Sequence, residues 1–226
     1  KKTAFVLLFI AALTGCNNKS HIPDVSGVKV DLKLERFDKD FFAIDSNNAH
    51  SGLNQLNAKY PLLTSIFLQS VLGLDSASTL AGVRQFLHLS QPIHDTVNDV
   101  FPNTDFIEKD FREAFRFVKY FFPQYKTPAQ VVTVIGPVDA LAQSITGYMP
   151  IFLGLVFLGI SLQFYLGKQF SVYSDPYFTE NVAPLYRSRR FSKEYIIADG
   201  MLLIVDDLFP NKSSGRPLIE QMIERG

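Results

Sequence analysis

The sequence predicts an α+β domain in which a helix-rich layer packs on a small β-sheet. Apolar residues recur at helical spacing through most of the first half and again near the end, whereas two short stretches are rich in β-branched residues. Apolar residues make up 47% of the 226 residues, enough to bury a core and to exclude a disordered chain. The 22 basic and 22 acidic residues balance, so we expect no nucleic-acid partner.

The first fifteen residues have the order of a secretory signal. Lys1 and Lys2 precede an apolar run at 4–13, which is too short to span a bilayer, and Leu-Thr-Gly then leads to Cys16, the only cysteine. This order resembles the bacterial lipoprotein signal, which implies that Cys16 is acylated with palmitate-type chains and becomes the mature N-terminus. Each buried methylene of such a chain contributes about 0.8 kcal/mol to membrane binding. An ordinary signal peptide with an incidental cysteine is the alternative.

The predicted organisation is therefore a signal peptide at 1–15, a lipidated N-terminus and tether at 16–26, and a single domain at 27–226. Lipidation of Cys16 leaves no disulfide, so the domain must fold on packing alone. The residue after Cys16 is Asn17 rather than aspartate, which favours the outer membrane by analogy with lipoprotein sorting.

Residues 28–32 alternate as a half-buried strand does, and the apolar positions of 34–44 recur at helical spacing. A helical pattern continues from 54 to 101, with turns expected at 60–61, 72–73 and 90–92. A longer helix is expected from Asp105 to Phe122, capped by Asn103 or Thr104 and stopped by Pro123.

The second half begins with a predicted strand at 130–138, which is rich in valine and bounded by prolines. Residues 149–166 are mostly apolar and predict a buried strand, or two strands with a glycine break; a transmembrane helix is the alternative. Strands near Val28, Val131 and Leu155 would form the sheet. A further helix is expected between Ser192 and Pro210, and the apolar stripe opened by Pro217 suggests that C-terminal residues are missing.

Several pieces, in order along the chain, resemble the gliding-motility lipoproteins of the GldB family. They are the signal ending at Cys16, LERFDKDFFAID, KYP, FYLGKQFSVY, RRFSKEYIIADGM and PLIEQMIERG. The resemblance implies a cell-envelope lipoprotein required for gliding motility, with no agreed biochemical activity.

The same family is distantly similar to zinc peptidases that carry His-Glu-x-x-His on a helix. In that motif two imidazoles bind zinc and the glutamate polarises a water molecule. The similarity places Lys193 and Ile197 at the histidine positions, Glu194 at the glutamate, and Glu224 near a third ligand. Neither Lys193 nor Ile197 can bind zinc, so the comparison implies a degenerate zincin-like scaffold, a pseudo-peptidase with no metal or other cofactor. An amphipathic helix with an exposed Lys-Glu pair is the plainer alternative.

Other groups of polar residues are candidate sites. Arg187, Arg189, Arg190 and Lys193 crowd into seven residues, and they form either a solvated surface or a contact for anionic lipid headgroups or an acidic partner. We expect the histidines to be surface or capping residues: His21, His50, His88 and His94. We expect no calcium or magnesium site among the acids near the C-terminal helix: Glu194, Asp199, Asp206 and Asp207.

The function that the sequence favours is non-enzymatic. A protein anchored through Cys16, facing the periplasm from the outer membrane, would help to assemble or stabilise the motility machinery beside other envelope motility or secretion proteins. One alternative is a zinc-dependent peptidase-like hydrolase, which the incomplete motif disfavours. The other is a lipid- or peptide-binding envelope module that uses the aromatic interior.

Overall fold

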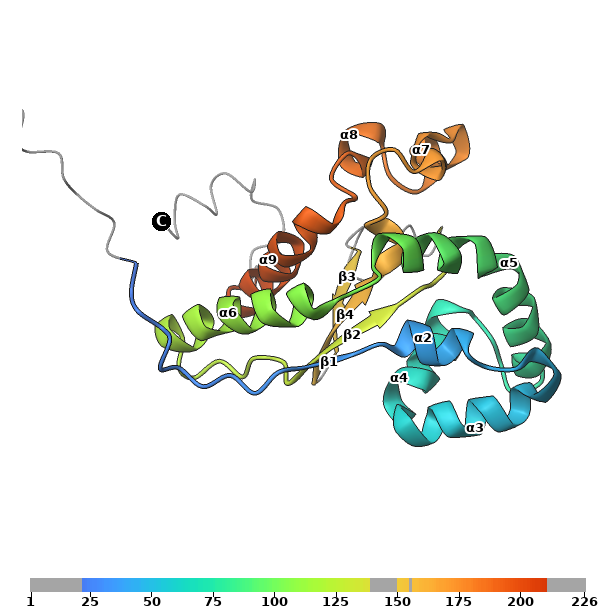
Figure 1. Ribbon diagram of the computed structural model, residues 1–226, viewed down its shortest axis with the longest axis horizontal. Coiled ribbons are helices and arrows are strands. Elements are labelled where there is room, and N and C mark those ends of the chain that lie inside the picture. The colour runs from blue at the N-terminus through green and yellow to red at the C-terminus, as the bar shows by residue number, and fades with distance from the viewer. Residues whose placement is uncertain (1–21, 139–149, 155, 211–226) are drawn as a thin grey trace, which may run out of the picture.

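A four-stranded mixed sheet lies between helices in the computed structural model, which describes residues 22–138, 150–154 and 156–210 (Figure 1). The strands are β1 (Lys33–Glu35), β2 (Gln130–Val134), β3 (Ile151–Leu153) and β4 (Phe157–Ser161). Their spatial order is β1-β2-β4-β3. β1, β2 and β4 run parallel, whereas β3 pairs antiparallel with β4 at the edge.

The helices of the first half follow one another closely along the chain. They are α2 (Phe37–Phe42), α3 (Ala49–Lys59), α4 (Pro61–Ile66), α5 (Thr79–Val100) and α6 (Asp105–Phe121). The first three pack on one face of the sheet, α6 packs on the other, and α5 contributes residues to the cores on both faces. A π-helical turn, Phe67–Val71, extends α4. The C-terminal helices are α7 (Pro176–Asn181), α8 (Leu185–Ser188) and α9 (Ile196–Leu208).

The sheet separates two apolar cores, because alternate residues of a strand point to opposite faces. Val131 of β2 belongs to the core beneath α6 and α9, together with Phe111 of α6. Its neighbour Val132 belongs to the core beneath α2, α3 and α4, together with Phe41. The predicted α+β class, with helices packed on a small sheet, is therefore confirmed, and the helices cover both faces rather than one.

The strand expected at 28–32 is wrong, because the first strand begins only at Lys33. Its neighbour β2 starts at Gln130, just after Pro128, and the ladder opens with the Lys33 amide donating to the Ala129 carbonyl at 3.1 Å. A strand needs a partner beside it, and proline has no amide to donate. Residues 28–32 therefore have the alternation of a strand without a neighbour that could extend the sheet.

The turn expected at 90–92 is also wrong, because α5 continues through Pro92. Proline in a helix interior costs roughly 3 kcal/mol. Val83 and Leu87 pack in one core and Val97 in the other, so burial on both sides of the proline outweighs that cost. The turns expected at 60–61 and 72–73 are confirmed, the second by Gly73 with a φ of +64°.

The apolar segment at 149–166 contains two strands with a glycine break, as the second strand interpretation predicted. The Gly154 amide donates to the Phe157 carbonyl at 2.8 Å, which closes the reversal between β3 and β4. A Cβ at Gly154 would lie 2.7 Å from the Phe157 ring, so a side chain does not fit there. Within the described ranges, no helix has both the length and the apolar character needed to cross a bilayer.

The helix expected after Ser192 is present in two parts. A 3₁₀ turn, Lys193–Tyr195, leads into α9, which ends at Leu208 before Pro210. The helix expected from Asp105 is α6, and it ends at Phe121, one residue before the predicted end.

Candidate functional site

Residues 171–195, which we call the α7–α8 knob, project from the rest of the molecule at α7 and α8 (Figure 1), while their buried side chains continue the core beneath α6 and α9. Its base is aromatic: the Phe191 ring contacts those of Phe164 and Tyr173 at centroid distances of 5.6 and 5.2 Å. The buried Tyr173 hydroxyl donates to the Gln163 carbonyl at 2.6 Å and accepts from the Leu166 amide at 3.2 Å. The knob is thus fixed to the body by ring packing and by a satisfied buried hydroxyl.

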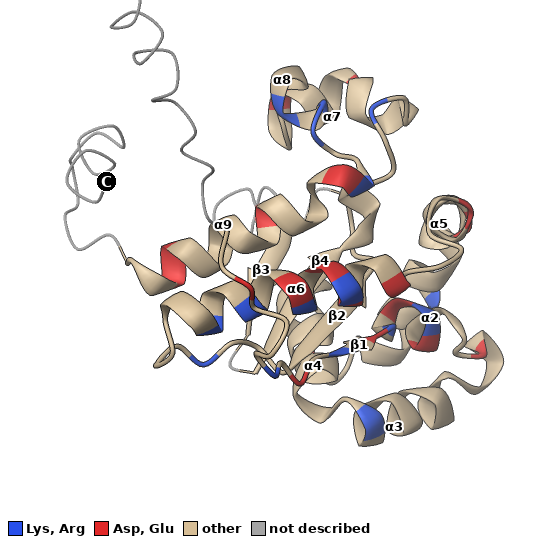
Figure 2. Cartoon of the chain, turned by 60° about the vertical axis from the view of Figure 1, so that its left-hand side comes forward, with Lys and Arg blue, Asp and Glu red and all other residues tan. Residues whose placement is uncertain are grey.

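The exposed residues of the knob include both cations and aromatic rings, and Figure 2 shows basic residues on and after α8. Tyr186 is 76% exposed and Tyr177 is 62% exposed, far more than tyrosines at a core boundary. We call the following residues the basic–aromatic surface: Tyr177, Leu185, Tyr186, Arg189, Arg190 and Lys193. Three of the four predicted patch residues belong to it; Arg187 is half-buried and has interactions of its own.

Arg190 connects this surface to the interior. Its Nη2 donates to Asp199 Oδ1 at 3.0 Å, and the Tyr165 hydroxyl donates to Asp199 Oδ2, also at 3.0 Å. The guanidinium lies over the Tyr195 ring, 4.9 Å from its centroid. Burial raises the pKa of Asp199 above its usual value, although Tyr165 and Arg190 oppose that shift. The arrangement fixes the direction in which Arg190 points.

The segment compared with His-Glu-x-x-His does not form one continuous α-helix. Lys193 and Glu194 lie in the 3₁₀ turn and are exposed, whereas Ile197 is half-buried in the first turn of α9. The metal motif needs two ligands one α-helical turn apart, so this backbone also departs from it. A hydrogen bond from Ser192 holds the pKa of Glu194 below its usual value. The zincin-like resemblance remains a hypothesis.

Among the described residues, no three acids, histidines or cysteines are gathered so that they could hold a metal ion. Asp207 instead accepts a hydrogen bond from the Tyr125 hydroxyl at 2.8 Å. His88 and His94 both lie on α5, and the His94 ring stacks on Phe42 with their centroids 4.3 Å apart. Cys16, His21 and Glu224 lie outside the described residues.

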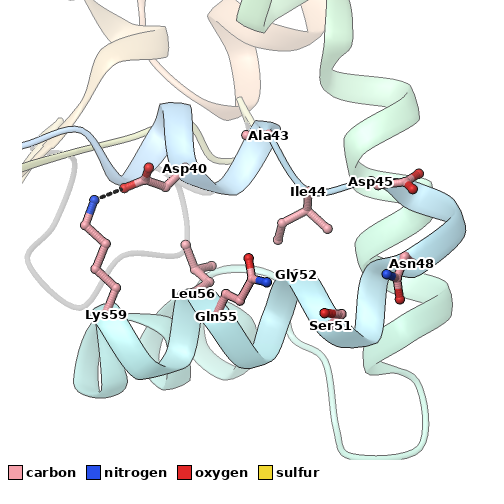
Figure 3. Close-up of a pocket in the computed structure, with 10 residues that line it drawn as sticks. All are labelled: Asp40, Ala43, Ile44, Asp45, Asn48, Ser51, Gly52, Gln55, Leu56 and Lys59. Carbon is pink, nitrogen blue, oxygen red and sulfur yellow. Dashed lines mark hydrogen bonds and ion pairs between the residues drawn. The ribbon is translucent and has the colours of Figure 1, made fainter.

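A groove of about 380 Å³ between α2 and α3 has no counterpart in the sequence predictions (Figure 3). Asp40 and Lys59 form an ion pair at one end, with Nζ 2.6 Å from Oδ2, and Asn48 lies at the other end. Ile44 and Leu56 form apolar walls between them. The groove is open and polar at its rim, and it holds a single close charge pair.

Asp40 also accepts a hydrogen bond from the Tyr60 hydroxyl at 2.6 Å, and that hydroxyl lies 3.3 Å from Glu35 Oε2. Burial works against ionisation of Asp40, but hydrogen bonds from Lys59 and Tyr60 outweigh it and hold the pKa of Asp40 below its usual value. Two family-like pieces, LERFDKDFFAID and KYP, therefore meet at this carboxylate. Their separation in sequence gave no sign of that contact.

Fold and surface together define a class of protein: an α+β domain that presents a basic and aromatic knob, with a mixed sheet buried between helices. The family model described as "Gliding motility protein GldB" matches residues 18–226, and the chain belongs to this family. Membership places it among the lipoproteins of gliding motility and thus in the cell envelope. No curated protein and no solved structure matches the chain.

Proposed function

We propose that the protein is a lipid-anchored, non-catalytic component that helps to assemble or stabilise the gliding machinery on the periplasmic side of the outer membrane. Membership of the GldB family supports a motility role, and the signal ending at Cys16 supports anchoring by acyl chains. The protein would work beside other envelope motility or secretion proteins.

One observation carries the assembly role: the residues of the basic–aromatic surface are exposed on a part of the molecule that projects from the body. Large exposed rings beside cations are typical of surfaces that contact other components, because an aromatic body gains from burial and a cation gains from an anionic neighbour. The surface would hold the domain in a defined position within the envelope.

Complementation in gliding cells that lack the native protein tests this function. Cys16→Ser should abolish both palmitate incorporation and motility, because the domain loses its membrane attachment. Arg189→Glu with Lys193→Glu should impair motility at a normal protein level. Lys39→Glu with Lys126→Glu changes the charge equally on exposed residues elsewhere and should leave motility intact.

The same assay separates an assembly role from the hydrolase alternative. Glu194 is the one residue of the degenerate motif that could still act as a base, and it is exposed. Glu194→Gln should retain full motility if the protein is an assembly component. Loss of motility in this variant, with the protein still folded and acylated, would favour an enzyme and overturn the proposal.

A further inference from the structure

We propose that the basic–aromatic surface lies against the phosphate headgroups of the bilayer that holds the acyl chains, so that the domain has two membrane contacts rather than one. This inference rests on the lipid anchor in the proposed function, and it names the partner of the knob. The second contact would fix how the domain is oriented on the membrane.

The chemistry of the surface fits a bilayer interface. Tyrosine places an apolar ring at headgroup level and keeps its hydroxyl in water, and Tyr177 and Tyr186 are both more than half exposed. Leu185, which directly precedes Tyr186 in the sequence, is 48% exposed. Arg189 and Lys193 are exposed cations that follow Tyr186 by three and seven residues. Each basic residue near an anionic membrane strengthens binding by about fivefold.

The orientation of the Arg190 guanidinium suits it to bind a phosphate group. Its contacts with Asp199 and with the Tyr195 ring fix the guanidinium, while the side chain stays 53% exposed. Guanidinium groups bind phosphate through two parallel hydrogen bonds. A side chain that is already fixed loses little freedom on binding, so Arg190 should contribute more than a mobile surface arginine would.

The position of the knob is consistent with the anchor. In Figures 1 and 2 the knob lies at the top of the molecule and α3 at the bottom, while the described chain begins at the level of α9. The nine residues from Cys16 to Asp24 can span at most about 30 Å. A projecting surface of this kind can meet a flat bilayer, and the tether begins in the same half of the molecule.

The experiment uses the acylated full chain in vesicles. Acylation of Cys16 leaves no thiol, so Tyr186→Cys or Asn57→Cys supplies a single site that can be labelled with a fluorophore. Asn57 is exposed on α3, at the end away from the knob. Lipids with spin-labelled headgroups, mixed with phosphatidylglycerol, should quench the probe at position 186 and leave the probe at position 57 bright.

Charge variants sharpen the test. Arg189→Gln with Lys193→Gln should lower the ratio of molecules whose knob contacts the membrane to those whose knob is free by about twenty-five-fold. Added salt should lower the same ratio. Lys39→Gln with Lys126→Gln is the matched control and should leave quenching unchanged. Glu194→Gln should increase quenching, because an exposed carboxylate beside Lys193 repels phosphate.

Absence of quenching at position 186, or equal quenching at both positions, overturns the inference. An acidic protein as the true partner would show no quenching at position 186 while the charge reversals still impair motility. If the chain is not acylated and does not bind vesicles at all, the lipid anchor of the proposed function is wrong instead. The two failures are therefore distinguishable.

Discussion

Two buried aspartates on opposite sides of the sheet have the same kind of partners and different surroundings. Asp38 accepts three hydrogen bonds from the Arg36 guanidinium and a fourth from the Thr133 hydroxyl. Asp199 binds Arg190 and accepts from the Tyr165 hydroxyl. Each site thus pairs one carboxylate with one arginine and one hydroxyl.

The two sites differ in how exposed the arginine is to solvent. Arg36 is 16% exposed, so its charge is fixed in the interior beside a fully buried carboxylate. Arg190 is 53% exposed and can reach solvent or a ligand. The same chemistry therefore serves the fold at β1 and α2, where it ties α2 to β2, and positions a surface arginine at α9. Burial of the cation decides which role a buried ion pair has.

The largest expected effect comes from removing the charge at the buried site. Asp38→Asn should lower the free energy of unfolding by about 3–5 kcal/mol, because Arg36 is left as an uncompensated buried charge. Urea denaturation followed by circular dichroism measures this, with Asp31→Asn as the control, since Asp31 is exposed. A loss below 1 kcal/mol would show that Arg36 can escape to water and would remove the contrast with Arg190.

A second test compares how tightly the two helical layers are packed. A Cβ at Gly200 of α9 would lie 2.4 Å from the buried Phe111 ring, whereas at Gly82 of α5 it would lie 2.3 Å from the end of the half-buried Leu74 side chain. A ring fixed in a core cannot move aside, but a leucine methyl group can.

Gly200→Ala should therefore destabilise the fold by about 1–3 kcal/mol. Gly82→Ala should be neutral or slightly stabilising, because alanine favours the helix by up to about 1 kcal/mol. Thermal unfolding of the two variants, measured side by side, gives the answer. Equal losses would mean that the α5 side is packed as rigidly as the α6–α9 side.

The third test concerns Asp199. Asp199→Asn keeps an acceptor for Tyr165 and frees Arg190 into solvent, so the loss of stability should be about 1 kcal/mol or less, well below that for Asp38→Asn.

The effect of pH on Asp199 has a definite sign. Burial raises its native pKa above the usual 3.8, so the native state binds this proton more tightly than the unfolded chain does. Its contribution to stability is complete below pH 3.8 and is lost as the pH rises through the native pKa. The stability of the parent minus that of Asp199→Asn should fall across this window in urea titrations. A rise would show that Arg190 dominates over burial.

The sequence predicted the parts of the fold that depend on local pattern. α6, the strand at Gln130 and the glycine break near Gly154 follow from periodicity, valine content and one tight turn. The helix through Pro92 could not be foreseen, because tertiary burial on both sides of a proline outweighs its local cost.

The candidate site, too, has features that the sequence predicted and features that only the structure shows. The basic cluster was readable because its members are neighbours in sequence, within Arg187 to Lys193. The exposure of Tyr186, and the meeting of Asp40 with Tyr60 across twenty residues, depend on how the elements pack. Only the structure separates Arg187, which is half-buried, from the three exposed cations.

The smallest expected effect on stability is at the groove between α2 and α3. The carboxylate of Asp40 there is a third case to compare with Asp38 and Asp199. Asp40 pairs with Lys59, and their side chains are 39% and 53% exposed, so solvent screens the pair. A double-mutant cycle with Asp40→Asn and Lys59→Met should give a coupling energy of about 0.5 kcal/mol, and in any case below about 1 kcal/mol.

The pH dependence of Asp40 is opposite in sign to that of Asp199. Because the native pKa of Asp40 is lowered, its contribution to the free energy of unfolding is present above pH 3.8 and is lost as the pH falls through the native pKa. Coupling above 2 kcal/mol would mean that water does not reach this ion pair, and Asp40 would then resemble Asp38 rather than an open-groove residue.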